Sequence, residues 1–154
     1  MGKILSLSNQ KGGTSKSSSA VNLGAALKMK GKKVLIVDLD PQGDASTYLG
    51  YEEESSDTIS QMMERFVRGE SIDLHDIIQV SEKNDGVEYL PADISLAGAE
   101  MYLVSVMSRE TVLKRMLSTN KKTAFIPEKG RMQSFCGIIK ITMKNINIMM
   151  KPNY

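Results

Sequence analysis

The sequence predicts an α/β fold in which a mainly parallel sheet is flanked by helices. Two apolar segments, residues 3–8 and 33–38, carry the prediction. The second is β-branched and continuously apolar, which is typical of strands buried on both faces of a parallel sheet. Between them, residues 17–30 repeat apolar side chains without helix breakers and end at Gly31. This order of strand, helix and strand predicts a βαβ unit.

Further stretches before residue 119 complete the predicted domain. Residues 59–67, 96–107 and 112–117 repeat apolar side chains at helical spacing, and we expect these faces to pack in the core. Residues 86–90 predict a short strand, and residues 41–44 predict a break after the second strand. A chain of 154 residues suits one domain, which we place at residues 1–118.

The composition is that of an ordinary globular protein, with 41% hydrophobic and 25% charged residues. No apolar run approaches the roughly 18 residues that a membrane-spanning helix needs, so we expect no membrane contact of that kind. Cys136 is the single cysteine, so no internal disulfide can form. This fits a reducing cytoplasm.

Residues 119–154 form a tail that differs from the rest in charge. Residues 1–118 hold 13 basic and 17 acidic side chains, a net charge of −4, whereas the tail holds 7 basic side chains and one acid, a net charge of +6. Basic tails often contact nucleic acid or anionic lipid. Within the tail, residues 136–143 could pair as a strand.

A glycine-containing loop follows the first predicted strand and opens the first predicted helix. It reads Lys11-Gly12-Gly13-Thr14-Ser15-Lys16-Ser17. Backbone N–H groups at a helix N-terminus hold phosphate oxygens, and glycines let the backbone approach them closely. Lys16 would reach the β and γ phosphates of a nucleotide, and the Ser17 hydroxyl would bind magnesium. This pattern therefore predicts a P-loop that binds ATP with Mg²⁺.

Two carboxylates, Asp38 and Asp40, follow the second predicted strand. Ligands of open α/β sheets bind beyond the carboxyl ends of the strands, so we expect both acids to face the contents of the P-loop. Carboxylates in this position can hold the waters of magnesium or orient a water for in-line attack. The alternative interpretation is a solvated turn before Pro41.

Together these motifs resemble the ParA/Soj partition ATPases, which are relatives of MinD. The segments that carry the resemblance are residues 9–23, 34–45, 90–100 and 107–114, so it covers about residues 1–118. It implies a P-loop NTPase-type fold and a loop of the two-lysine pattern K-G-G-x-x-K-[ST]. The nucleotide would be held by Gly12, Gly13, Thr14, Ser15, Lys16, Ser17 and Ser18.

The resemblance also implies roles for single residues. Lys11 would reach the nucleotide of a second copy, so that ATP binding favours a homodimer. Asp40 would position the attacking water, which makes Lys11, Lys16 and Asp40 the catalytic set, while Asp38 would lie beside the magnesium with Ser17. Family members are cytoplasmic, nucleoid-associated bacterial ATPases that bind DNA nonspecifically. A centromere-binding partner of the ParB type stimulates hydrolysis during plasmid or chromosome segregation.

Two departures from the family pattern qualify these roles. Ser15 stands where the family has glycine, and a positive φ there would strain the backbone. No apolar run ending in an acid, the Walker B strand of the family, follows residue 118. We therefore expect a sheet that is incomplete at its C-terminal side. We interpret residues 119–154 as a frameshifted or rearranged tail whose basic charge is accidental.

These departures leave other functions open. One is a nucleotide-binding module without turnover, which could form mixed dimers with an intact relative. Another is a gene fragment that does not fold.

Overall fold

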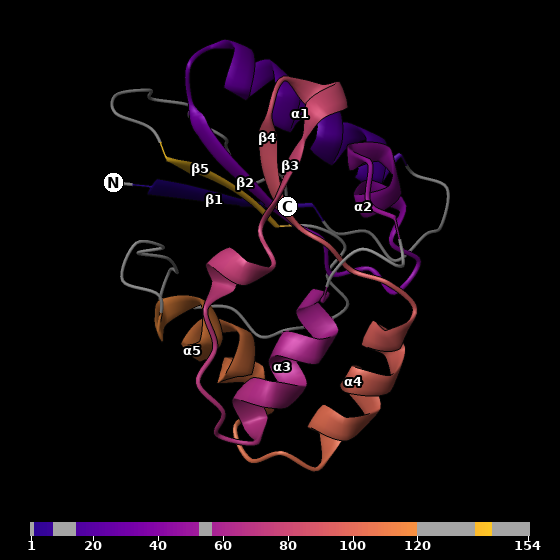
Figure 1. The fold of residues 1–154 in the computed structure, drawn as a ribbon, viewed down its shortest axis with the longest axis vertical. Coiled ribbons are helices and arrows are strands. Elements are labelled where there is room, and N and C mark those ends of the chain that lie inside the picture. Colours follow the sequence, from indigo (N-terminus) through magenta and orange to yellow (C-terminus); the bar gives the residue numbers. More distant parts are fainter. Residues whose placement is uncertain (1, 8–14, 53–56, 120–137, 143–154) are drawn as a thin grey trace, which may run out of the picture.

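The computed structural model describes residues 2–7, 15–52, 57–119 and 138–142. These residues form three layers, with the sheet between two groups of helices (Figure 1). Helices α1 (Lys16–Met29) and α2 (Asp44–Leu49) lie on one face. Helices α3 (Ile59–Val67), α4 (Ser95–Val104) and α5 (Val112–Thr119) lie on the other.

The predicted βαβ unit is present as β1 (Gly2–Ser6), α1 and β2 (Lys33–Val37). Its boundaries agree with the prediction to within two residues. A Cβ atom on Gly24 would lie 2.7 Å from Ile36 Cδ1, so glycine at this position lets α1 approach β2 closely.

The remaining predictions up to residue 119 are mostly confirmed. α3 and α5 form where helical spacing predicts them, and β4 (Val87–Leu90) forms within residues 86–90. The helix predicted over 96–107 is wrong at its end, because α4 stops at Val104 and Met107 is 90% exposed. Helix α2 and strand β3 (Gln79–Ser81) were not predicted. Short 3-10 helices occupy Leu74–Asp76, Glu82–Asn84 and Arg109–Thr111.

The five strands are ordered β1-β5-β2-β4-β3. β5 (Ile138–Thr142) confirms the strand predicted within residues 136–143, and it lies between β1 and β2, antiparallel to both. β2 and β4 are parallel, whereas β3 is antiparallel to β4. The α/β class is therefore confirmed with a mixed sheet. β1, β2 and β4 share one direction, as predicted, and the tail strand β5 and the short β3 run the other way.

The core divides at β2, whose side chains alternate between the two faces of the sheet. Val34 and Ile36 pack with α1 and α2, while Leu35 and Val37 pack with α3, α4 and α5. All four side chains are buried. β2 is thus covered on both faces, as its continuous apolar sequence predicts.

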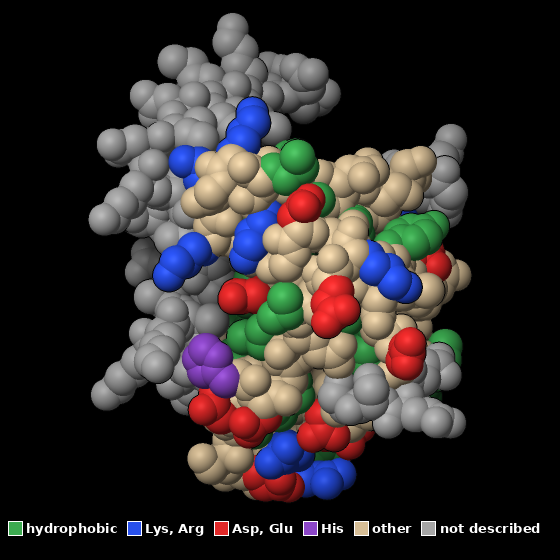
Figure 2. Space-filling model, turned by 45° about the horizontal axis from the view of Figure 1, so that its top comes forward, with side chains coloured by type: hydrophobic (Ala, Val, Ile, Leu, Met, Phe, Trp, Pro, Cys, Tyr) green, Lys and Arg blue, Asp and Glu red, His purple; other side chains and the backbone are tan. Residues whose placement is uncertain are grey.

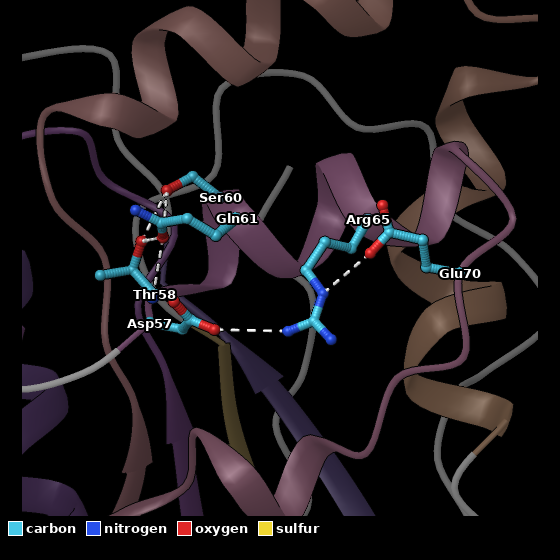
Figure 3. Close-up of polar contacts among 6 residues, drawn as sticks. All are labelled: Asp57, Thr58, Ser60, Gln61, Arg65 and Glu70. Atoms are coloured by element: carbon cyan, nitrogen blue, oxygen red, sulfur yellow. Dashed lines mark hydrogen bonds and ion pairs between the residues drawn. The ribbon is translucent and has the colours of Figure 1, made fainter.

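Charged side chains of both signs are mixed over the face drawn in Figure 2. Ion pairs of α3 are among the exposed contacts. Arg65 contacts Asp57 at 3.4 Å and Glu70 at 3.1 Å (Figure 3). Such exposed pairs contribute at most about 1 kcal/mol each. Within the described part of the chain, no helix is long and apolar enough to cross a membrane.

Candidate functional site

β1 and β2 end level with each other at one edge of the sheet. Ser6 and Val37 pair with the same β5 residue, Ile138, from opposite sides. Neighbouring strands lie about 4.8 Å apart, so the two strand ends are about 10 Å apart. The segment after β1, where the P-loop is predicted, and the acids after β2 therefore leave the sheet at the same edge.

Helix α1 begins beside the predicted loop. Lys11, Gly12, Gly13 and Thr14 lie outside the described residues, so their roles stay predictions. Ser15 has φ 55° and ψ 27°, the left-handed conformation that was predicted to strain a serine. Its carbonyl accepts the first helical hydrogen bond, from the Ser19 N–H at 2.8 Å. Lys16, Ser17 and Ser18 thus form the first turn, where N–H groups point out of the helix end.

The first turn of α1 suits an anion. It contains no acidic residue, and among the described residues no side chain caps it at Ser15. Lys16, Ser17 and Ser18 are half-buried rather than fully exposed. The helix dipole adds positive potential at this end, and a lysine there adds a full positive charge. These residues fit the phosphates of a nucleotide.

Asp38 is a buried carboxylate at the carboxyl end of β2, with an exposed fraction of 1%. Its Oδ2 accepts two hydrogen bonds from Ser46, from the hydroxyl at 2.7 Å and the N–H at 2.9 Å. Its Oδ1 accepts one from the Asp40 N–H at 3.1 Å. Burial raises the pKa of Asp38, and the bonds from Ser46 and Asp40 oppose that rise.

Asp40 lies in the turn that follows and is only partly buried. Its Oδ1 accepts from the Gln42 N–H at 3.0 Å, and its carbonyl accepts from the Gly43 N–H at 2.9 Å. Gly43 has φ 64°, and a Cβ there would lie 2.7 Å from the Ala92 carbonyl oxygen. The turn therefore needs glycine at this residue for both conformation and space.

A second polar cluster lies beyond the end of the neighbouring strand β4. Asp93 Oδ1 accepts from the Ser95 N–H at 3.1 Å and from the Thr58 hydroxyl at 3.3 Å. Thr58 and Gln61 form a capping box at the start of α3, with the Thr58 N–H 2.8 Å from Gln61 Oε1 (Figure 3). This cluster joins the N-terminal ends of α3 and α4 next to the acidic turn.

Protein side chains alone do not assemble a metal centre in the part of the chain that the structure describes. No group of three or more His, Cys, Asp or Glu side chains is placed to hold an ion there. Asp40 provides a partly exposed carboxylate and Ser17 a hydroxyl, while Asp38 adds a buried carboxylate whose oxygens already accept hydrogen bonds from Ser46 and Asp40. Such a set suits Mg²⁺, which commonly keeps several waters and takes few protein ligands beside substrate phosphates.

The family model described as an AAA domain matches residues 2–125. The chain belongs to this family. Among its curated relatives, the sporulation initiation inhibitor protein Soj of Bacillus subtilis is 43% identical over 124 residues, covering 79% of this chain and 46% of Soj. The chromosome-partitioning ATPase Soj of Treponema pallidum is 37% identical over 123 residues, covering 80% and 46%. These relatives confirm the resemblance to the ParA/Soj family that the motifs indicated.

A solved structure of the same fold contains a nucleotide. Cobyrinic acid a,c-diamide synthase from Mycobacterium smegmatis, with bound ADP and magnesium, matches with a TM-score of 0.64 and 34% identity. The match covers 73% of this chain and 43% of that protein. The chain therefore spans less than half the length of these relatives.

Sequence reasoning found the acids but missed the residue that holds them. The spacing of Asp38 and Asp40 after an apolar strand is readable, whereas Ser46 lies in a helix that the chain break at 41–44 concealed. A signal was available, because Gly43 precedes and Gly50 follows a six-residue stretch that reads as one short helix between two glycines.

Proposed function

We propose that this chain binds ATP with Mg²⁺ at the edge where β1 and β2 end. The supporting observation is that β1, which precedes α1 along the chain, and β2, which precedes the Asp38–Asp40 turn, end level with each other at the same edge of the sheet. One side carries a lysine and helix N–H groups, and the other carries two carboxylates. This distribution of charge matches an anionic phosphate chain that carries a divalent cation.

Each predicted site residue has a place in this proposal. Gly12, Gly13 and Thr14 would line the phosphate loop, with Ser15 to Ser18 continuing it into α1. Lys16 would neutralise the phosphates. The Ser17 hydroxyl would be a magnesium ligand, with the charge of Asp38 behind it. The more exposed carboxylate, Asp40, would hold the water that attacks the terminal phosphate.

We further propose that the site serves partition, as in Soj and ParA relatives. In this role Lys11 contacts the nucleotide of a second copy, so that ATP drives formation of a homodimer. A ParB-type centromere-binding protein and nonspecific DNA are the proposed partners, with the nucleoid in the bacterial cytoplasm as the place of action. The names of the chromosome-partitioning relatives support this proposal.

A second candidate is a nucleotide-binding module without turnover. The observation that favours it is the absence from the sequence of an apolar run ending in an acid after residue 118, where the only acid is Glu128. Such a module would form mixed dimers with an intact relative. Single-turnover ATP hydrolysis, with and without DNA and the partner protein, separates the two candidates.

Titration with a fluorescent ATP analogue in Mg²⁺ tests the proposal. Replacing Lys16 by alanine removes charge-assisted contacts to phosphate, so the affinity should fall about a hundredfold. Lys30→Ala is the matched control, because Lys30 is exposed beyond the far end of the same helix and should leave the affinity unchanged. Equal affinities of the two variants would contradict the proposal.

A further inference from the structure

Ser46 is fully buried, with no exposed surface, although it carries a hydroxyl. Its hydroxyl donates to Asp38 Oδ2 at 2.7 Å and accepts from the Ala92 N–H at 2.9 Å. Its own N–H donates to the same Oδ2 at 2.9 Å. The N–H and the hydroxyl of Ser46 are thus hydrogen-bonded to residues that follow β2 and β4.

These contacts join three elements at the edge that carries the proposed site. Asp38 follows β2, Ser46 belongs to α2, and Ala92 follows β4. The Asp38 N–H also donates to the Leu90 carbonyl at 3.1 Å, so the Asp38 backbone is itself hydrogen-bonded to the last residue of β4. Asp38 is therefore fixed from α2 and from β4 at the same time.

The two carboxylate oxygens of Asp38 accept hydrogen bonds from different residues. Oδ2 accepts two hydrogen bonds from Ser46, and these occupy both of its lone pairs. Oδ1 accepts a hydrogen bond from the Asp40 N–H. The orientation that Ser46 gives the carboxylate therefore places the acceptor of the Asp40 N–H, in a turn where the Asp40 carbonyl also accepts from the Gly43 N–H. Among the described residues no donor reaches Asp40 Oδ2, so Asp40 keeps an oxygen for a ligand.

We propose that Ser46 is a positioning residue for the acidic side of the nucleotide site. It orients Asp38, whose buried charge stands behind the magnesium in the proposed site, and through Asp38 it acts on Asp40, whose more exposed carboxylate faces the magnesium–nucleotide complex. Ser46 contacts neither nucleotide nor metal itself. The inference rests on the proposed ATP site for its functional meaning, but its geometric content concerns the Asp40 backbone alone.

Three full-length variants test this role. Ser46→Ala removes the hydroxyl that orients Asp38. Ser46→Thr keeps the hydroxyl and adds a methyl group, which separates hydrogen bonding from packing. Thr47→Ala is the matched control, since it removes a hydroxyl from the exposed neighbour on the same helix. Thermal unfolding of each variant identifies any that fails to fold.

The functional readout is the affinity for a fluorescent ATP analogue, measured in Mg²⁺ and in EDTA. Ser46→Ala should lose about tenfold in affinity in Mg²⁺ and little in EDTA, because the acidic side acts on the metal. Ser46→Thr should keep most of the wild-type affinity in Mg²⁺, because it keeps the hydroxyl, even if its unfolding midpoint is lower. A purely structural role would instead weaken binding equally in both conditions, and that result would overturn the proposal.

Amide hydrogen exchange at Asp40 provides a readout that needs no nucleotide. Its exchange rate should rise about tenfold in Ser46→Ala and stay unchanged in Thr47→Ala, because the Asp40 N–H loses a fixed acceptor. An unchanged Asp40 rate in Ser46→Ala would contradict the positioning role. Absence of nucleotide binding by the wild-type chain, with the exchange effect present, would sink the proposed function and leave the positioning of Asp40 intact.

Discussion

The strands β1 and β2 carry the two halves of the proposed site, and they are held in different ways. β2 pairs with β4 and β5 and is buried between helices on both faces. β1 lies at the edge of the sheet, and its one partner among the described strands is β5, which comes from the tail. β2 thus has a strand partner, β4, from residues 33–119 as well as β5, whereas β1 pairs among the described strands with residues 138–142 alone.

This difference changes the meaning of the tail. Residues 119–154 look foreign in composition, yet five of them pair with both β1 and β2. Whatever the origin of the tail, β5 supplies the hydrogen-bond ladder that joins the P-loop strand to the rest of the sheet. Four sets of substitutions separate the contributions of the two halves.

Ile139→Pro should have the largest effect. Ile139 pairs with Leu5 of β1 and with Ile36 of β2, and proline within a central strand removes a ladder hydrogen bond. The loss should be about 3 kcal/mol of unfolding free energy in a urea titration, with loss of amide protection in β1. Ile139→Val is the control, because it keeps the N–H. Full protection of β1 in the proline variant would show that β1 does not depend on β5.

Gly43→Ala should cost nearly as much and act on the acidic half. The new Cβ would meet the Ala92 carbonyl oxygen at 2.7 Å, and alanine would be forced to φ 64°. We expect a loss of about 3 kcal/mol, combining backbone strain and overpacking. Gly50→Ala has the strain alone, since no atom lies within 4 Å of its Cβ position, and should cost about 1 kcal/mol. Chemical denaturation measures the unfolding free energy of both variants. Equal losses would show that the close contact with the Ala92 carbonyl oxygen contributes nothing.

Asp38→Asn should destabilise the protein by about 2 kcal/mol, although it removes a buried charge. The asparagine NH₂ group must face either the Ser46 donors or the Asp40 N–H, so one donor is left without an acceptor. The exposed Asp44→Asn, in the first turn of α2, should change stability by less than about 0.5 kcal/mol. Thermal unfolding measures both, and a neutral or stabilising Asp38→Asn would show that the charge is not held by its hydrogen bonds.

Ser15→Gly should have the smallest effect and sharpen the phosphate half. Glycine relieves the left-handed strain at φ 55°, but it also loosens the unfolded chain, so the net gain should be about 0.5 kcal/mol. Ser108 has φ 58° far along the chain, and Ser108→Gly should give the same gain in stability. A change in nucleotide affinity should appear only for Ser15→Gly. The same change in both variants would argue against a phosphate site at α1.

Much of the fold could be predicted because local patterns decide it. The apolar run at 33–38 and the helical repeats at 59–67 and 112–117 each contain their own signal. The place of β5 could not be predicted, because strand pairing across residues 120–137 is a long-range choice that no local pattern encodes. The turn at 41–44 likewise hid α2, since its breakers also act as the start of a short helix.

The candidate site shows the same division. Lys16, Ser17, Asp38 and Asp40 could be named from motif spacing, whereas for Ser15 the sequence indicated only that a positive φ would be strained, and the structure shows that φ is positive. The roles of Ser46 and Ala92 depend on two elements meeting at one sheet edge. Such contacts follow from the tertiary arrangement, so they could not be read from the sequence.

The proposed nucleotide site lies between the start of α1 and the Asp38–Asp40 turn. The most direct measurement is an NMR titration of the ¹⁵N-labelled chain with a nonhydrolysable ATP analogue and Mg²⁺. A site at this position should give saturable shifts at the amides of Ser17, Ser18 and Asp40, with little change along α5. Saturation without shifts at these amides, or shifts confined to α5, would contradict it.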